Sequence, residues 1–332
     1  MSQVKTMADS AVATPARSKS ALVKEWLIHY PMLWVLALLL MVTTYLYPGF
    51  WNPVNLQNML MQNVALTVAS IGMTFVIMAG GFDLSVGAVY ATGAVFYLSL
   101  DGVAPAIVSI IATILLGTAC GVVNGTLVNY FKINPFVATL GTSSAFIGLM
   151  TLYAGANVKF SSSDEYGFIG SYKWNDLIPL LTVIGVAIFV LSAIVLAKTT
   201  YGRSVYAVGG NKEAARLSGI RVGLISASTF VLIGGLAALG GVFTASQLGT
   251  AMPNFVGNMT LDAIAVVIIG GTSLVGGEGA MWRTGVGLAI LAIVNNLFTS
   301  MNLAPALQLV FKGAIVIVAV GVDVYIRRRE AN

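Results

Sequence analysis

The sequence predicts an all-α fold: a polytopic bundle of about ten transmembrane helices with both termini in the cytoplasm. Three observations support this prediction. Of the 332 residues, 58% are hydrophobic and 9% are charged, whereas about 25% of a soluble domain is charged. The apolar residues gather into long runs, and a helix needs about 20 such residues to cross a bilayer. Nearly all basic residues lie between these runs or at the termini.

Ten apolar runs are candidate spans, and several are shorter than the ideal length, so breaks or re-entrant pieces remain open. They cover about 32–48, 63–80, 84–100, 103–123, 133–154, 177–197, 223–246, 261–277, 283–300 and 304–325. The transmembrane domain therefore takes in residues 31–326, followed by a basic tail, 327–332. A polar tail, 1–30, precedes it. No small-residue cleavage site follows the first run, which favours a retained span over a removed signal peptide.

The distribution of basic residues predicts the orientation. With the N-terminus in the cytoplasm, fourteen Lys and Arg residues fall on the cytoplasmic side, and two, Lys159 and Lys173, fall outside. This is the asymmetry that membrane proteins show. An odd number of spans would place the cluster Arg327–Arg329 outside, so an even number is favoured.

Two segments in the two halves of the chain share a glycine-interrupted pattern. Val76–Gly87 and Val266–Gly277 match at one constant offset, with Gly80 opposite Gly270 and Gly81 opposite Gly271. Matching breaks in apolar segments indicate a transport path, because a broken helix exposes backbone groups that need a cavity or protein around them. Two tight turns between spans are the alternative interpretation, since Gly-Gly also suits turns.

Polar residues near these breaks and in other apolar runs are candidates for lining the path. Asp83 and Ser85 also suit a cap at the start of the next helix. Each polar candidate has an alternative role as a hydrogen bond between helices. The predicted pathway residues are Gly80, Gly81, Asp83, Ser85, Asn124, Gly270, Gly271, Thr272, Ser273, Asn295 and Asn296.

Two further features bear on packing and on the outer surface. Gly117, Gly121 and Gly125 repeat at four-residue spacing, which allows helix backbones to approach closely. Packing within the chain is favoured over a seam between two copies. The outer loops, 155–176 and 248–260, either face a partner or cap the bundle.

A polar segment, Gly209–Gly219, stands inside the basic loop 198–222 between two apolar runs. Asn211 suits a helix cap, Glu213 suits the first turn, and Gly219 suits a left-handed end. The segment therefore predicts a helix of about two turns in the cytoplasm. Such a short helix is unstable alone, so we expect it to pack on a partner.

The series Glu213-Ala214-Ala215, three residues and Gly219 resembles the cytoplasmic signature of ABC importer permeases. Further motifs resemble the ribose, arabinose, galactose and xylose branch: Gly72–Ile77, Gly81–Gly87, Gly209–Asn211, and Leu261–Ala265 running to Gly270–Leu274. They span most of the chain in a specific order. The Leu-Pro continuation of the commonest importers is absent, and Thr260 stands where this branch often has Glu.

The resemblance implies the permease subunit of an ATP-driven importer for a ribose-like pentose or a hexose, in a bacterial inner membrane. The implied partners are a second permease copy, a cytoplasmic ATPase, a periplasmic sugar-binding protein and membrane lipid. The chain lacks a Gly-x-x-x-x-Gly-Lys-Ser/Thr loop, so ATP hydrolysis is expected on another chain. The implied ATPase-coupling residues are Gly209, Gly210, Asn211, Glu213, Ala214, Ala215, Arg216 and Gly219.

The remaining composition argues against other classes of function. One histidine, His29, and one cysteine, Cys120, leave no pattern for a metal site or a thiol nucleophile, so neither an enzyme nor a cofactor is expected. The basic residues form no single patch for nucleic acid. An ion-driven secondary transporter and a purine-nucleoside permease remain alternatives. The spans hold few ionisable groups, and Lys312 in the last one has a stem that can reach an interface.

Overall fold

The computed structural model describes residues 31–175, 178–254 and 257–330. The predicted tail 1–30, with His29, and residues 331–332 lie outside the described residues. The chain is helical, which confirms the all-α class. The helices are α2 (Pro31–Leu46), α3 (Pro53–Met78), α4 (Val86–Ser99), α5 (Ala106–Asn129), α6 (Pro135–Ala154), α7 (Asp164–Ser171), α8 (Leu180–Lys198), α9 (Thr200–Gly210), α10 (Lys212–Leu217), α11 (Val222–Leu248), α12 (Met259–Ile269), α13 (Met281–Ser300) and α14 (Pro305–Glu330).

Six helices among the described residues are long and apolar enough to cross a membrane: α3, α5, α6, α8, α11 and α13. The other four predicted spans fall on shorter apolar helices, namely α2, α4, α12 and the segment Pro305–Ile315 of α14. The chain is therefore a multi-pass membrane protein. Two helices depart most from the predicted boundaries: α3 begins at Pro53 instead of 63, and α12 ends at Ile269 instead of 277, where glycines with positive φ follow.

Helix α11 lies at the centre and packs against α3, α4 and α5. The contact with α5 is made by backbone, because a Cβ on Gly121 would overlap the Phe230 carbonyl oxygen and a Cβ on Gly117 would overlap that of Gly234. Phe230 and Ile233 are fully buried in the adjoining core. The small-residue stripe on α5 thus serves packing within the chain, as favoured from the sequence.

The two predicted outer loops join each other and close one end of the bundle. Strand β1 (Lys159–Phe160) pairs antiparallel with β4 (Thr250–Ala251), and β2 (Lys173–Trp174) pairs with β3 (Ile178–Pro179). Ser246 at the end of α11 donates to the Tyr166 carbonyl of α7 at 2.7 Å. These contacts cap the bundle; a partner on this surface remains a prediction.

A carboxylate two residues after the end of α4 fixes the first of these loops. Asp101 accepts hydrogen bonds from the Ser162 amide at 2.6 Å and from the Ser163 hydroxyl at 2.7 Å. Burial acts to raise the pKa of Asp101, but the hydrogen bonds from Ser163 and Ser162 outweigh it and hold that pKa below its ordinary value. The carboxylate therefore stays charged and holds loop 161–163 at neutral pH.

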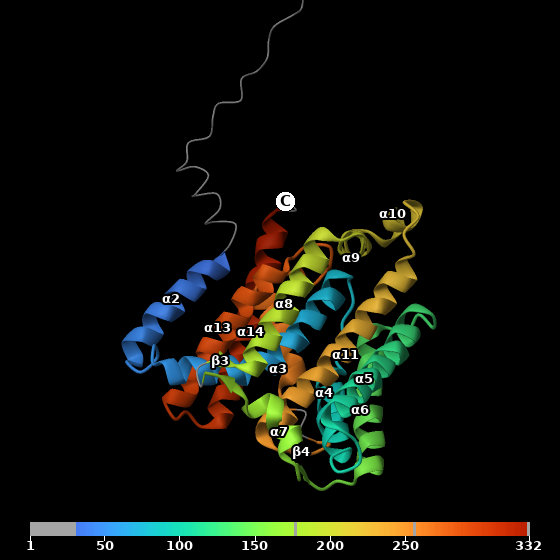
Figure 1. The fold of residues 1–332 in the computed structure, drawn as a ribbon. Coiled ribbons are helices and arrows are strands. Elements are labelled where there is room, and N and C mark those ends of the chain that lie inside the picture. Colours follow the sequence, from blue (N-terminus) through green and yellow to red (C-terminus); the bar gives the residue numbers. More distant parts are fainter. Residues whose placement is uncertain (1–30, 176–177, 255–256, 331–332) are drawn as a thin grey trace, which may run out of the picture.

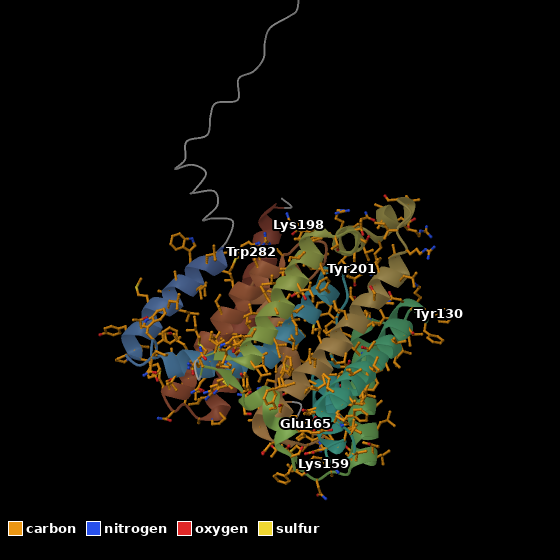
Figure 2. All side chains as sticks on the ribbon, viewed as in Figure 1. Tyr130, Lys159, Glu165, Lys198, Tyr201 and Trp282 are labelled. Carbon is orange, nitrogen blue, oxygen red and sulfur yellow. The ribbon has the colours of Figure 1, made fainter. Side chains whose placement is uncertain are left out.

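The start of α2, the end of α14 and the pair α9–α10 lie at one end of the molecule, and α7 and β4 lie at the other (Figure 1). Figure 2 places Lys198 and Trp282 at the first end and Lys159 and Glu165 at the second. Chain ends on one side are what an even number of crossings produces.

The α5–α11 contact gives a prediction about stability. Gly121→Val places a branched side chain against the α11 backbone, so we expect a loss of about 1–3 kcal/mol or failure to fold. Gly148→Ala in α6 is the control, because a Cβ there meets no neighbouring atom and alanine favours helix. Thermal unfolding in detergent compares them, and equal melting temperatures would show that α5 and α11 do not pack in this way.

Candidate functional site

The short polar helix forms where the sequence places it. In α10, the Asn211 side chain accepts hydrogen bonds from the amides of Glu213 and Ala214 at 3.0 and 2.9 Å. Gly219 takes φ +80° and ends the turn. Both predicted caps are therefore confirmed.

Helix α10 lies almost free on the surface. Ala215 is its buried residue and packs toward the rest of the chain. Arg216 and Glu213 form an exposed ion pair at 2.6 Å, and Leu217 is 80% exposed. An exposed pair of this kind stabilises a helix by well under about 1 kcal/mol. A capped helix that presents charges and a large apolar side chain suits a partner groove.

The sequence predicts residues 198–222 as a basic loop and does not predict helix α9 within it. Its signals are a Thr199 cap, which accepts from the Gly202 amide at 3.2 Å, and the apolar residues Tyr201, Val205 and Val208. Their spacing of four and three residues is that of one helix face. Val205 and Val208 are fully buried, so α9 is anchored and links α10 to the bundle.

At its end, α9 meets the first glycine break and the loop that follows the second, at a place we call the glycine junction: Gly80, Gly209, Gly276 and Gly277. The Gly277 amide donates to the Met78 carbonyl at 2.9 Å. A Cβ on Gly209 would overlap that same oxygen. The junction therefore joins the end of α3, the loop after α12 and the end of α9 through backbone atoms.

Tyr206 adds a side-chain link to this junction. Its hydroxyl donates to the Gly279 carbonyl at 2.9 Å. Burial raises the pKa of Tyr206, while the nearby charge of Arg283 opposes this rise. The hydroxyl therefore keeps its proton and holds the loop after α12 against α9.

The two breaks end their helices in the same way, with a shift of one residue from the sequence match. After α3, Gly80 donates to the Ile77 carbonyl and Gly81 to that of Val76. After α12, the same two bonds come from Gly271 and Thr272. Gly80 and Gly271 have φ +73° and +83°, as a left-handed helix end requires. The equivalent positions are thus Gly80 and Gly271.

Three predicted pathway residues come together in a buried network beside the first break. Asp83 accepts from the Ser85 hydroxyl at 2.6 Å, and Asn124 on α5 donates to Ser85 at 2.7 Å. Thr142 on α6 donates to the Asn124 side chain at 2.6 Å. Ser85 stands at the cap position of α4 but its side chain makes no cap hydrogen bond. The geometry fits the interhelical alternative, and a pathway role remains a prediction.

Thr260, where the resembled branch often has Glu, connects the two halves at this network. Its hydroxyl accepts from the Gly87 amide at 2.9 Å. That amide is one of the N-terminal donors that α4 cannot satisfy internally. The first residues of α12 thereby hold the start of α4. Thr272 and Ser273, after the second break, are both buried.

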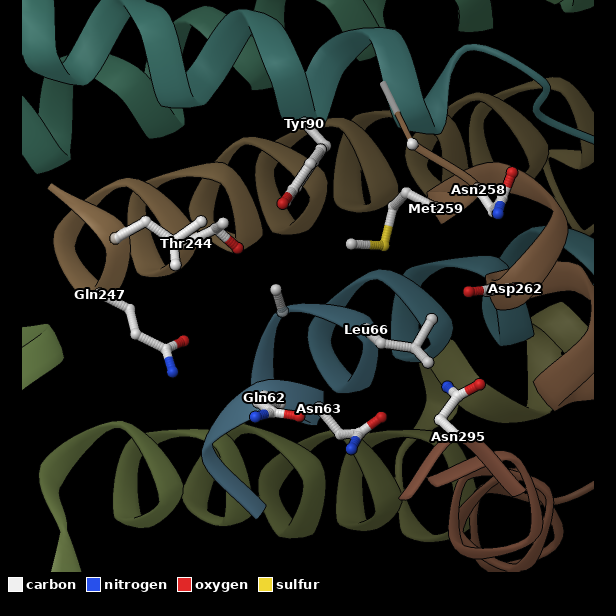
Figure 3. Close-up of a pocket in the computed structure, with 13 residues that line it drawn as sticks. Gln62, Asn63, Leu66, Tyr90, Thr244, Gln247, Asn258, Met259, Asp262 and Asn295 are labelled. Atoms are coloured by element: carbon white, nitrogen blue, oxygen red, sulfur yellow. The ribbon is translucent and has the colours of Figure 1, made fainter. Parts of the chain in front are cut away.

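The adjacent asparagines of α13 have different surroundings. Asn296 exchanges hydrogen bonds with Asn55 of α3 at 2.8 and 3.3 Å, which is an interhelical role. Asn295 lines a cavity of about 310 Å³ near the capped end (Figure 3).

Lys312 pairs with Asp262 in the cavity wall at 3.0 Å instead of reaching an interface. Of the residues that line this cavity, Asn295 alone is a predicted pathway residue, because a single amide in an apolar run gives no local indication that it lines a cavity.

The fold and α10 together define a class: a multi-pass membrane protein with a surface helix suited to a partner. Residues 55–320 match the family described as the branched-chain amino acid transport system permease component. The chain belongs to this family.

Curated relatives cover most of the chain. The ribose import permease of Bacillus subtilis is 38% identical over 87% of this chain and 90% of its own length. The ribose import permease of Escherichia coli K12 is 34% identical over 90% of this chain and 95% of its own. The D-allose transport system permease of the same strain is 32% identical over 89% and 91%. No solved structure gives a significant match.

The glycine junction gives a prediction that needs no knowledge of substrate. Gly209→Ala forces the α9 end away from the Met78 carbonyl, so we expect faster amide hydrogen exchange across residues 200–217. Gly210→Ala is the matched control, because a Cβ there meets no neighbouring atom. Mass spectrometry of the two variants measures the effect. Identical exchange in both would refute the close backbone contact.

Proposed function

We propose that this chain is the membrane-spanning permease subunit of an ATP-driven importer that translocates a monosaccharide, delivered by a periplasmic binding protein. The observation that carries the proposal is α10, capped at both ends and exposed along its charged face. The relatives are named as permeases for ribose, D-allose and galactose, which favours a sugar over the amino acid of the family description.

The division of labour follows from what this chain contains. It has no phosphate-binding loop, so a separate cytoplasmic ATPase hydrolyses ATP. Gly209–Asn211 position α10, and Glu213, Arg216 and Leu217 meet the ATPase groove. Movement of α10 reaches the glycine junction through α9. A second permease copy completes the assembly in the inner membrane.

The proposal includes ten spans with both chain ends in the cytoplasm. In support, ten apolar helices coincide with the ten predicted runs, and the described chain ends lie at the same end as α10 (Figure 1). Lys198 lies at that end as well (Figure 2). On this orientation the glycine junction faces the cytoplasm, and the cavity lies in the outer half.

Reconstituted vesicles test the substrate and the energy source together. With ATPase and binding protein present, we expect uptake of a radiolabelled pentose or hexose that needs ATP and survives collapse of the ion gradients. The same vesicles are offered a purine nucleoside. Uptake that follows an ion gradient without ATP would identify a secondary transporter, and uptake of nucleoside alone would identify the other alternative.

Charge substitutions in α10 test the docking role. Glu213→Arg or Arg216→Glu alone breaks the ion pair and reverses one charge, so we expect loss of sugar-stimulated ATP hydrolysis with normal membrane insertion. The double substitution Glu213→Arg with Arg216→Glu keeps the pair within the helix but exchanges the two positions. If the ATPase recognises each charge at its own position on α10, we expect the double variant to be inactive as well. Recovery in the double variant would limit their role to helix stability.

A further inference from the structure

The cavity near the capped end is built from five elements that meet between the two halves of the chain. The helices α3, α4 and α11 contribute Gln62, Asn63, Ala65, Leu66, Tyr90, Thr244, Gln247 and Leu248. The start of α12 and Asn295 of α13 close the remaining sides (Figure 3). Its volume of about 310 Å³ lies at the lower end of the range for small-ligand pockets, ~300–1,000 Å³.

The polar part of the wall is made mainly of side-chain amides. An amide offers both donors and an acceptor, which matches a hydroxyl group that donates and accepts at once. Tyr90 and Thr244 add hydroxyls, and Met259 and Leu66 add apolar surface. The charged or amide residues of the wall are Gln62, Asn63, Gln247, Asn258, Asp262 and Asn295.

One of these amides has an unused acceptor. The side-chain oxygen of Asn295 is buried and has no hydrogen-bond partner among the described residues. A buried acceptor without a partner costs about 1–3 kcal/mol. The amide nitrogen of Asn295 lies on the cavity side of the side chain (Figure 3), where it can donate to a ligand hydroxyl.

The cavity wall carries no net charge. Its carboxylate, Asp262, is paired with the Lys312 ammonium of α14 at 3.0 Å, and both side chains are 18% exposed. An amino acid needs a cation for its carboxylate and an anion for its ammonium group. Here the two opposite charges already satisfy each other, and the neighbouring groups are neutral. The wall therefore suits an uncharged, hydroxyl-rich ligand.

We propose that this cavity is a binding site for one uncharged monosaccharide within the permease, in addition to the site on the binding protein. The inference rests on the proposed function and deepens it, because it assigns the sugar a place inside the chain. Asn295, Gln62 and Asn63 bind sugar hydroxyls, and the pair of Asp262 with Lys312 excludes zwitterionic ligands.

Cysteine labelling tests this site directly. Asn258→Cys and Gln247→Cys are made in the chain assembled with its ATPase, in membranes without the binding protein, and are treated with a hydrophilic maleimide. Cys120 is buried, so the parent chain gives the background. Asn254→Cys is the matched control, because Asn254 is an exposed asparagine of the same loop outside the cavity.

We expect ribose or galactose to slow labelling at positions 258 and 247, to about half when the sugar concentration equals the dissociation constant. Labelling at 254 stays unchanged, and leucine protects neither position. Protection by leucine, equal protection at 254, or no protection by any sugar overturns the inference. If sugar uptake in reconstituted vesicles is positive, failure here leaves the proposed function intact; if uptake is absent, the proposed function itself fails.

Discussion

The structure depends on one backbone contact, in which the Met78 carbonyl receives the Gly277 amide and lies against Gly209. No side chain intervenes, so the three segments cannot slide past one another by changing rotamers. Packed backbone shifts between discrete arrangements instead of deforming gradually. The contact therefore connects α9, and with it the start of α10, to the end of α3 and to the loop after α12.

A helix that breaks inside a membrane protein leaves backbone donors and acceptors that must be satisfied within the protein. At the first break, Asp83 accepts from the Ser85 amide, Thr139 from that of Leu84, and Thr260 from that of Gly87. At the second, Arg283 donates to the Gly271 carbonyl. These polar residues have a structural reason to be present, independent of any contact with substrate. Their position beside the breaks alone does not identify them as path-lining.

The sequence was informative where structure is local. The caps of α10 follow from residues within a few positions of each other, so Asn211 and Gly219 were predictable. The predicted span 261–277 runs past the end of α12 at Ile269 because it was drawn through the Gly270-Gly271 break, and in the structure Gly271 turns the chain there. Cavity residues such as Gln62 and Gln247 are far apart in the chain, and their meeting is a tertiary fact without a local pattern.

The cavity and the glycine junction lie toward opposite ends of the same helices. Helix α3 carries Gln62 and Asn63 at the cavity and ends at Met78 in the junction. Helix α12 begins at the cavity with Met259 and Asp262 and ends at the second break. With eleven residues it spans about 16 Å. A helix this short is close to rigid, so a displacement of its end at Ile269 would be carried to Met259 and Asp262 at the cavity. The same two helices therefore link the glycine junction with the cavity.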